Sequence, residues 1–125
     1  MDFIKLLSEK KIDLSLIDRY IIISSTNKEG IIDYVSEAFC KITGYSKDEL
    51  IGQKHNILRD PNTPNELYKD LWKNLTEGKD WEGEIKNRTK SGDEYWLKAH
   101  IMPIFDDNRE VEGYIAFRQD ITQLV

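Results

Sequence analysis

The chain has 125 residues, which is the size of one domain and is long enough to bury one hydrophobic core. Hydrophobic residues make up 39% of it and charged residues 33%, a composition typical of globular proteins, and the formal net charge is −5. The acidic balance and the lack of any run of Lys and Arg argue against a nucleic-acid partner, and the apolar runs are too short for insertion into a membrane.

The first part of the chain predicts one helix followed by a β-hairpin. An amphipathic helix is expected over residues 1–18, where apolar positions recur on one side of a helix. β-Branched residues predict a strand over 20–26, and a second apolar run predicts another over 31–36, with the turn sequence Asn-Lys-Glu-Gly between them. The apolar stripe of the helix consists of Phe3, Ile4, Leu6, Leu7, Leu14, Leu16 and Ile17.

Helix-capping residues mark three helices after the hairpin. Ser36 and Ser46 are each placed to cap a short helix, and Gly44 ends the first of these. Pro64 opens the longest helix of the chain after a polar, irregular segment. The apolar face of this long helix is formed by Leu67, Leu71, Trp72 and Leu75.

Three extended segments close the chain, at 81–90, 93–105 and 110–121, with turn sequences between them. The complete order predicts an α+β fold, in which a five-stranded antiparallel sheet carries short helices on one face and an N-terminal helix. Both alternating sets of residues over 93–105 include apolar side chains. We therefore expect both faces of the sheet to be covered, the second one by the N-terminal helix or by another subunit.

One polar residue lies in the apolar phase of the strand over 81–90. Charged residues occupy every other position of this strand, which puts Asn87 in the same phase as Trp81 and Ile85. A buried amide without hydrogen-bond partners costs about 1–3 kcal/mol. Either a backbone segment or buried water satisfies this amide, or the polar edge of a ligand does. The small residues Gly83 and Ala99 would leave room for a flat ring.

The remaining reactive side chains carry little chemical signal. Cys40 is the only cysteine, which rules out an internal disulfide, and we interpret it as a buried apolar residue. His55 and His100 lie far apart in sequence, so no metal site is predicted, and a solvated or capping role is expected for each. No nucleophile and base have catalytic spacing, so we do not expect an enzyme. In the absence of a signal-peptide core, a cytoplasmic location is expected.

Several motifs occur together in an order that identifies a family. They are the sequence GYSKDELIG at 44–52, the pattern W.G....R.K.G..YW beginning at Trp81, and the closing sequence GYIAFRQDIT at 113–122. With the order of elements, these motifs resemble a PAS domain over nearly the whole chain. The resemblance implies a PAS sensor domain over 19–122, with residues 123–125 as the start of a connector to an output domain.

The central segment is similar to one branch of this family. Residues 52–99 resemble the FAD-binding PAS domains of bacterial aerotaxis receptors and nitrogen-fixation redox sensors. This similarity implies a sensory module of a bacterial signal-transduction protein, which binds FAD and relays redox or oxygen state to an output domain. Photoactive flavin PAS domains have a reactive cysteine at the position of His55, so blue-light adduct chemistry is not expected here.

The resemblance also assigns roles to individual residues. Arg59 would lie near the adenine or phosphate side of FAD, Trp81 along the isoalloxazine ring, and Asn87 at the edge of that ring. Arg118 would reach the ring from the last strand. The complete set of implied cofactor-binding residues is Ser36, Asn56, Arg59, Trp72, Trp81, Asn87, Leu97 and Arg118.

Two alternatives to a flavin sensor remain open. One is a haem-binding gas sensor with His55 or His100 as the axial ligand. The other is a PAS domain with no ligand, or an unassigned one, that acts as a dimerisation and interaction module. A homodimer is expected through the N-terminal helix and the outer face of the sheet, where Trp96 and Phe117 add apolar surface.

Overall fold

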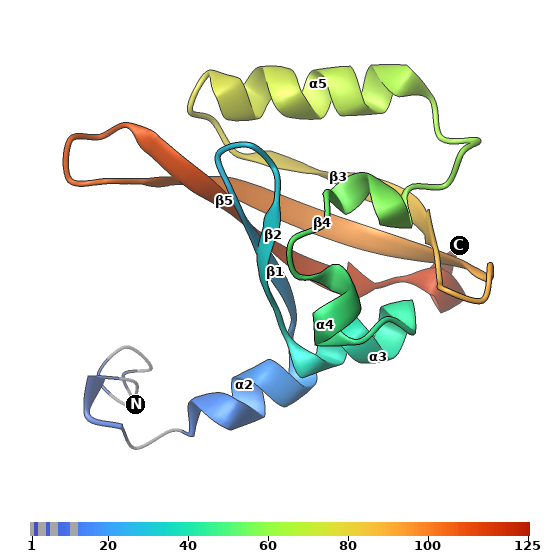
Figure 1. The fold of residues 1–125 in the computed structure, drawn as a ribbon, viewed down its shortest axis with the longest axis horizontal. Coiled ribbons are helices and arrows are strands. Elements are labelled where there is room, and N and C mark those ends of the chain that lie inside the picture. Colours follow the sequence, from blue (N-terminus) through green and yellow to red (C-terminus); the bar gives the residue numbers. More distant parts are fainter. Residues whose placement is uncertain (1, 3–4, 6–7, 11–12) are drawn as a thin grey trace.

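The computed structural model describes residues 2, 5, 8–10 and 13–125. Figure 1 shows a curved sheet with helices along one side of it. The helices are α2 (Leu14–Tyr20), α3 (Glu37–Thr43), α4 (Lys47–Leu50) and α5 (Asn65–Thr76), with short 3-10 helices η1 (His55–Leu58) and η2 (Thr122–Leu124). The strands are β1 (Ile22–Asn27), β2 (Ile32–Val35), β3 (Trp81–Arg88), β4 (Glu94–Phe105) and β5 (Val111–Asp120).

The five strands form one antiparallel sheet in the order β2-β1-β5-β4-β3. This order confirms the predicted α+β fold and its five-stranded sheet. The last strand of the chain, β5, lies at the centre of the sheet, between β1 of the first hairpin and β4. As a result Ser24 pairs with Ala116, and Ile22 pairs with Arg118, although these residues are far apart in sequence.

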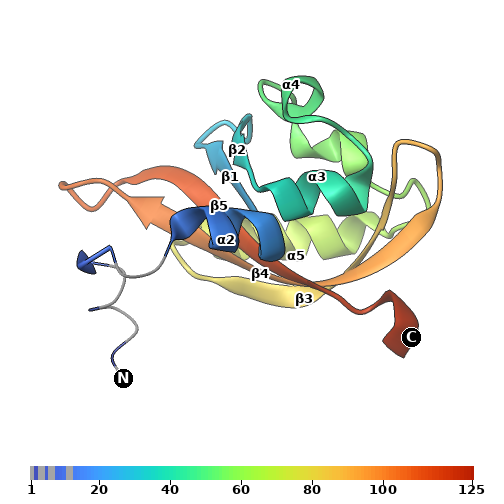
Figure 2. The ribbon, with the colours of Figure 1, turned by 90° about the horizontal axis from the view of Figure 1, so that it is seen from below.

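The helices α3, α4 and α5 lie on the same face of the sheet, as Figure 2 shows. They bury two separate apolar cores rather than one. One core joins α5 to the meander and consists of Leu71, Leu75, Trp81, Ile85, Ala99 and Tyr114. The other joins the hairpin to α3, α4 and η1 and consists of Ile32, Val35, Phe39, Leu50 and Leu58.

The predicted caps account for the short helices. The Ser36 hydroxyl oxygen accepts a hydrogen bond from the Phe39 amide (3.2 Å), and Gly44 ends α3 with a left-handed φ of 79°. Ser46 and Glu49 form a reciprocal capping box at α4. These local bonds fix the direction of the chain as it leaves the hairpin and place η1 over the inner face of the sheet.

The N-terminal helix differs from the prediction. Within the described residues, Lys10 has a φ of 57° and Asp13 is the extended N-cap of α2, so the chain is not one continuous helix over 1–18. The helix also ends later than expected, at Tyr20. Four residues of the predicted apolar stripe, Phe3, Ile4, Leu6 and Leu7, lie outside the described part of the chain.

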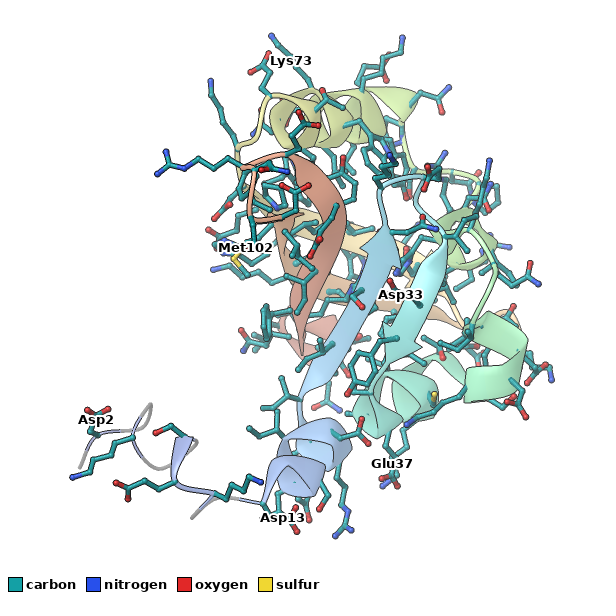
Figure 3. All side chains as sticks on the ribbon, turned by 60° about the vertical axis from the view of Figure 1, so that its left-hand side comes forward. Asp2, Asp13, Asp33, Glu37, Lys73 and Met102 are labelled. Carbon is teal, nitrogen blue, oxygen red and sulfur yellow. The ribbon has the colours of Figure 1, made fainter. Side chains whose placement is uncertain are left out.

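Polar contacts join α2 to β2, α3 and α4, at one end of the sheet (Figure 3). The Tyr34 hydroxyl donates to the Asp18 carboxylate, Lys47 lies 3.9 Å from the same carboxylate, and Arg19 lies 4.0 Å from Glu37. The outer face of the sheet therefore keeps apolar surface, and Phe117 is 39% exposed there. No helix in the described ranges is long and apolar enough to cross a bilayer.

Candidate functional site

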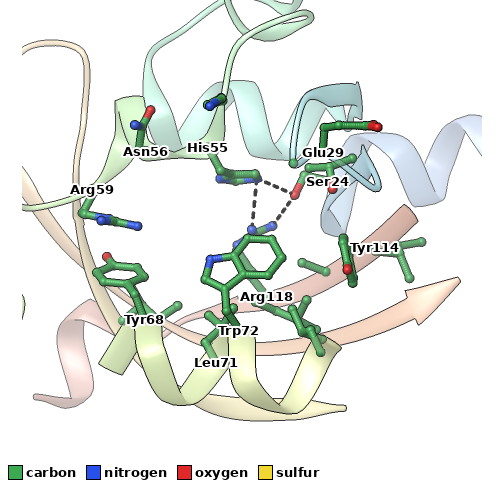
Figure 4. Close-up of a pocket in the computed structure, with 18 residues that line it drawn as sticks. Ser24, Glu29, His55, Asn56, Arg59, Tyr68, Leu71, Trp72, Tyr114 and Arg118 are labelled. Carbon is green, nitrogen blue, oxygen red and sulfur yellow. Dashed lines mark hydrogen bonds between the residues drawn. The ribbon is translucent and has the colours of Figure 1, made fainter. Parts of the chain in front are cut away.

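A cavity of about 320 Å³ lies between the sheet and the helices, where the two cores do not meet (Figure 4). Its wall combines residues from β1, β5, α5, η1 and the turn after β1. The apolar part of the wall is formed by Leu71, Trp72, Leu75, Ile85, Ile101, Tyr114, Ile115 and Ala116. The polar part is formed by Ser24, Thr26, Glu29, Lys54, His55, Asn56, Arg59, Tyr68 and Arg118.

Trp72 makes a half-exposed edge of this cavity. It is 39% exposed and meets the Tyr114 ring edge to face, with ring centroids 5.3 Å apart. A side chain at Gly30 would come within 3.9 Å of the Trp72 ring. The ring is thus held between α5 and the β1–β2 turn, and the apolar wall behind it continues into the core below α5.

Three side chains from three different elements form the polar end of the cavity. An Arg118 guanidinium nitrogen on β5 donates to the Ser24 hydroxyl oxygen on β1 (2.8 Å), and the other lies 3.3 Å from Nε2 of His55 on η1. Ser24 Oγ and His55 Nε2 are 3.0 Å apart. Figure 4 shows the three groups pointing toward one another above the Trp72 ring.

The charges of this cluster follow from its burial. Burial, and secondarily the nearby Arg118 charge, lower the pKa of His55 to about 3, so the imidazole is neutral at physiological pH. Arg118 can only donate, and its bond therefore requires Nε2 to be the unprotonated nitrogen. The Ser24 hydroxyl can then donate to Nε2 while it accepts from Arg118. Burial lowers the pKa of Arg118 to about 10, and the guanidinium stays charged.

A shallow groove continues from the cavity along the start of α5. Arg59, Tyr68 and Trp72 belong to both, and Asn65 and Lys69 complete the groove. The Arg59 guanidinium lies 3.5 Å from the centre of the Tyr68 ring. This arrangement offers aromatic surface and two cations immediately outside the cavity.

Comparison with known proteins places this fold in a family. The model of the PAS domain family matches residues 18–123. The chain belongs to the PAS domain family. The chain is 35% identical over 107 residues to the aerotaxis receptor of Escherichia coli (strain K12), which covers 86% of this chain and 21% of that protein. It is 33% identical over 102 residues to the nitrogen fixation regulatory protein of Klebsiella pneumoniae, covering 82% of this chain and 21% of the relative.

Solved structures agree with this assignment. A PAS domain from Colwellia psychrerythraea superposes with a TM-score of 0.79 at 25% identity, over 98% of this chain and 99% of that one. A light-oxygen-voltage domain studied with a flavin analogue gives the same TM-score at 21% identity, over 98% of this chain and 88% of that one, which shows a shared fold. This PAS domain spans about a fifth of the length of the two curated relatives above.

Half of the residues predicted to bind a cofactor line the cavity of this PAS domain. They are Asn56, Arg59, Trp72 and Arg118. The others lie behind the wall. Leu97 is 1% exposed, and Ser36 is fully buried and has the structural role of donating to the Ile21 carbonyl while it accepts from the amides of Ile23 and Phe39.

Asn87 is buried as predicted, but its partner is the protein itself. With the amide nitrogen facing the nearby carbonyls, it donates to Leu58 (3.3 Å) and to Lys86 (3.2 Å). The amide also neighbours the Tyr95 hydroxyl, whose pKa burial raises to about 12. Of the two explanations offered by the sequence, a backbone partner is the one that this structure contains. Asn87 thereby ties η1 to β3.

Trp81 also serves the core. Its indole N–H donates to the Asp70 carboxylate on α5 (3.0 Å), and its ring covers Gly83 so closely that a side chain there would approach within 2.6 Å. Gly83 is therefore small because of Trp81 and not because of a ligand. Ala99 is fully buried in the same core, so the interpretation of these two residues as space for a flat ring was wrong.

Ser24, Tyr68 and Tyr114 are cavity residues that the sequence did not single out, and His55, considered as a haem ligand, also lines the cavity. A solvated or capping role was the prediction for His55, and it was wrong, because the polar loop that carries His55 folds over the inner face. The alternation of Ser24 and Thr26 with isoleucine and serine in β1 was an available signal for a polar inner surface. The Tyr68 hydroxyl is buried and has no hydrogen-bond partner in the described part of the chain.

The second histidine has no part in the cavity. His100 lies exposed on the outer face of the sheet, with Nε2 3.1 Å from the Asp80 carboxylate. In the described ranges, no group of three His, Cys, Asp or Glu residues could hold a metal ion. Of the two histidines considered for haem, only His55 faces the cavity, and its Nε2 accepts from Arg118.

Proposed function

We propose that this PAS domain is the sensory module of a larger signal-transduction protein, in which it binds a flavin, specifically FAD, and relays redox or oxygen state to an output domain. The observation that carries the proposal is the cavity, where an apolar wall from α5 and the sheet faces polar groups that include the half-buried Arg118 guanidinium, whose hydrogen-bond partners are neutral. An oxidised flavin ring is apolar on its faces and polar along one edge, and therefore matches this division. The similarity to an aerotaxis receptor and to nitrogen fixation regulatory proteins supports the same class of signal.

The dimensions of the site support a ring inside and a nucleotide tail outside. Ligand cavities are typically about 300–1,000 Å³, and the cavity of about 320 Å³ is at the lower end of this range. The tail would follow the groove, where Arg59 and Lys69 offer positive charge to phosphates and Tyr68 offers a ring for stacking. When bound, the flavin would supply reversible electron transfer.

Arg118 and its partners are suited to transmit a change at the ligand. The guanidinium joins β5 to β1 through Ser24 and to η1 through His55. A new partner for Arg118 in the cavity would weaken one or both of these bonds and alter how the hairpin and η1 are held. Because α2 leads directly into β1, such a shift reaches the N-terminal helix and any subunit packed on it. Asn87 would take part in this shift only if its amide broke the hydrogen bond to the Leu58 carbonyl.

The surface for subunits and for the output domain is the outer face of the sheet together with α2. Trp96 is half-buried and Phe117 is exposed on that face, and Leu16 is 46% exposed on α2. We propose a homodimer through these elements, in agreement with the expectation from the sequence. The output domain would follow η2 in the parent protein.

The test is an absorption spectrum of protein purified without added ligand, followed by release of the cofactor and its identification by mass. Flavin bands and an FAD mass are expected. A cavity-filling variant, Ala116→Leu, should lose these bands while its circular dichroism stays native, because Ala116 lines the cavity and is 5% exposed. The matched control is Ala38→Leu on α3, which is outside the cavity wall and should keep the flavin.

The spectrum also separates the alternatives. A Soret band would replace the proposal with a haem sensor, and a colourless protein that no added flavin can reconstitute would contradict it. One observation favours the colourless, ligand-free alternative: the Asn87 amide has a backbone partner and needs no ligand. An Asn87→Ala variant measures the point directly, since retention of normal flavin content would remove Asn87 from the ligand contacts.

A further inference from the structure

The cavity has the opposite charge to the molecule that contains it. The chain as a whole has a formal net charge of −5. The cavity wall contains three permanent cations, Lys54, Arg59 and Arg118, and one carboxylate, Glu29, while His55 is neutral. A wall of this kind selects for negative charge on whatever enters it.

Arg118 is the cation at the inner end, and its charge has no counter-charge in the fold. Its partners are a hydroxyl oxygen and an imidazole nitrogen, and its guanidinium carbon lies 5.1 Å from the centre of the Phe39 ring. None of the ion pairs in the described part of the chain includes Arg118. Glu29, the carboxylate of the wall, belongs to the turn after β1 and forms no ion pair with it. Arg118 is half-buried, and an unpaired charge that is partly removed from water is costly, so proteins keep such charges where a ligand or a reaction uses them.

We propose that Arg118 makes the cavity sensitive to the charge of its ligand, by stabilising negative charge that appears on the flavin when it is reduced. The inference rests on the proposed function. A neutral oxidised ring that takes up two electrons from a dissolved reductant and one proton from water carries one negative charge. Arg118 stabilises that charge, whereas the neutral oxidised ring gains only hydrogen bonds from it. The site therefore favours the reduced anion.

His55 and Ser24 are positioning residues in this scheme. They hold the guanidinium at the inner end of the cavity with two neutral hydrogen bonds, which cost less to give up than an ion pair would. The negative charge competes with these two acceptors for the N–H groups of Arg118. Reduction is thereby converted into a change in hydrogen bonds to β1, a strand of the hairpin, and to η1, which packs against the hairpin.

The experiment is a spectroelectrochemical titration of the flavin-loaded protein with dithionite as reductant. Arg118→Gln keeps hydrogen-bond donors but loses the charge, and should lower the stability of reduced relative to oxidised flavin by about tenfold or more. For a two-electron couple, a tenfold change corresponds to a midpoint potential about 30 mV more negative. Arg118→Lys should retain most of the wild-type potential. Lys98→Gln is the matched control, because it removes the same charge from the outer face of β4, where Lys98 pairs with Glu82 at 3.3 Å.

A second readout keeps the inference testable if Arg118→Gln cannot hold flavin. Wild-type protein reduced at pH 6 should show the absorption spectrum of the anionic reduced flavin and not that of the protonated one. A protonated spectrum would overturn the role of Arg118, and so would an unchanged potential in Arg118→Gln. In either case the flavin is present and the proposed function stands. A wild-type protein that binds no flavin overturns both proposals and is recognised before any titration.

Discussion

Two charges on the inner side of this PAS domain, one buried and one half-buried, are treated in opposite ways. The Asp60 carboxylate is fully buried at the end of η1, where it accepts from the Asn62 amide (2.8 Å) and lies 3.5 Å from both Lys86 and Arg88. Arg118, on the central strand, has a hydroxyl and a neutral imidazole as its partners. The Asp60 charge is compensated by two cations of the same chain, whereas the Arg118 charge has no such partner and is available to a ligand.

The difference separates a structural site from a functional one. The backbone bond from Asn62, and then the charges of Lys86 and Arg88, lower the pKa of Asp60, so the fold stabilises its charged form. Burial lowers the pKa of Arg118, so the fold disfavours its charged form. Asp60 thus joins η1 to β3, whereas Arg118 is a charge that the fold alone does not explain.

The largest expected effect on stability is that of Phe39, the apolar residue whose ring packs against Arg118. Phe39 is 1% exposed and its ring contacts both the guanidinium and the His55 ring, whose centroid is 5.8 Å away. Phe39→Ala should cost about 3–5 kcal/mol of unfolding free energy, measured by chemical denaturation. Phe39→Leu is the matched control and should cost far less. If both variants lost equal stability, the contacts of the aromatic ring, and not the apolar volume of the side chain, would account for the contribution of Phe39.

The Arg118 cluster and the Asp60 site should lose stability in different pH ranges. His55 determines the range for the Arg118 cluster. Its pKa is about 3 in the fold and 6.5 as a free side chain, so the unfolded chain binds more protons between these values. The free energy of unfolding should therefore fall as the pH decreases from 6.5 toward 3, by at most about 1.4 kcal/mol per pH unit. Denaturation at several pH values measures this slope.

Substitution identifies the group responsible for the slope. His55→Gln should flatten it, and His100→Gln on the exposed outer face should leave it in place. A slope that survives in His55→Gln would mean that the imidazole is not buried in the neutral form, and the description of the Arg118 cluster would be wrong.

Asp60 should act in a lower pH range and in the same direction, because its pKa is also lowered by the fold, which here favours the charged form of the group. Its pKa is lowered below 3.8, so its contribution is complete above that value and is lost as the pH falls through the lowered pKa. Asp60→Asn should reduce stability at pH 7, and the difference from wild type should shrink below pH 3.8. Glu82→Gln, which breaks the exposed pair with Lys98, should change little. If Asp60→Asn and Glu82→Gln changed the free energy of unfolding equally, the buried Asp60 carboxylate would contribute no more than a surface one, and the prediction would fail.

The smallest effect is expected for Arg118 itself. Arg118→Met replaces an uncompensated cation by an apolar chain of similar length, and stability should stay within about 1 kcal/mol of wild type or increase. Denaturation of the ligand-free protein measures this value. A large loss, comparable to that of Phe39→Ala, would show that Arg118 is a structural residue after all, and the contrast with Asp60 would fail.

Elements and family were readable from the sequence because both depend on local patterns. Ser36 and Ser46 fix helix starts by hydrogen bonds within a few residues, and Pro64 does so by its restricted φ. All three starts were predicted correctly. Alternation over 81–90 predicted that Asn87 and Ile85 are buried, as they are. The N-terminal segment was less predictable, since an apolar stripe does not show that the chain turns at Lys10.

The site depended on contacts that no local pattern records. The sequence by itself determined the five strands, the capped helices and which face of β3 is buried, because periodicity and capping act over a few residues. Only the tertiary structure decided that β5 is inserted beside β1, which brings Arg118 to Ser24 and lets the η1 loop place His55 above both. It also decided that Asn87 bonds to the backbone of Leu58. These pairings lie 29 to 94 positions apart, so they depend on how distant elements pack and not on any short-range pattern of residues.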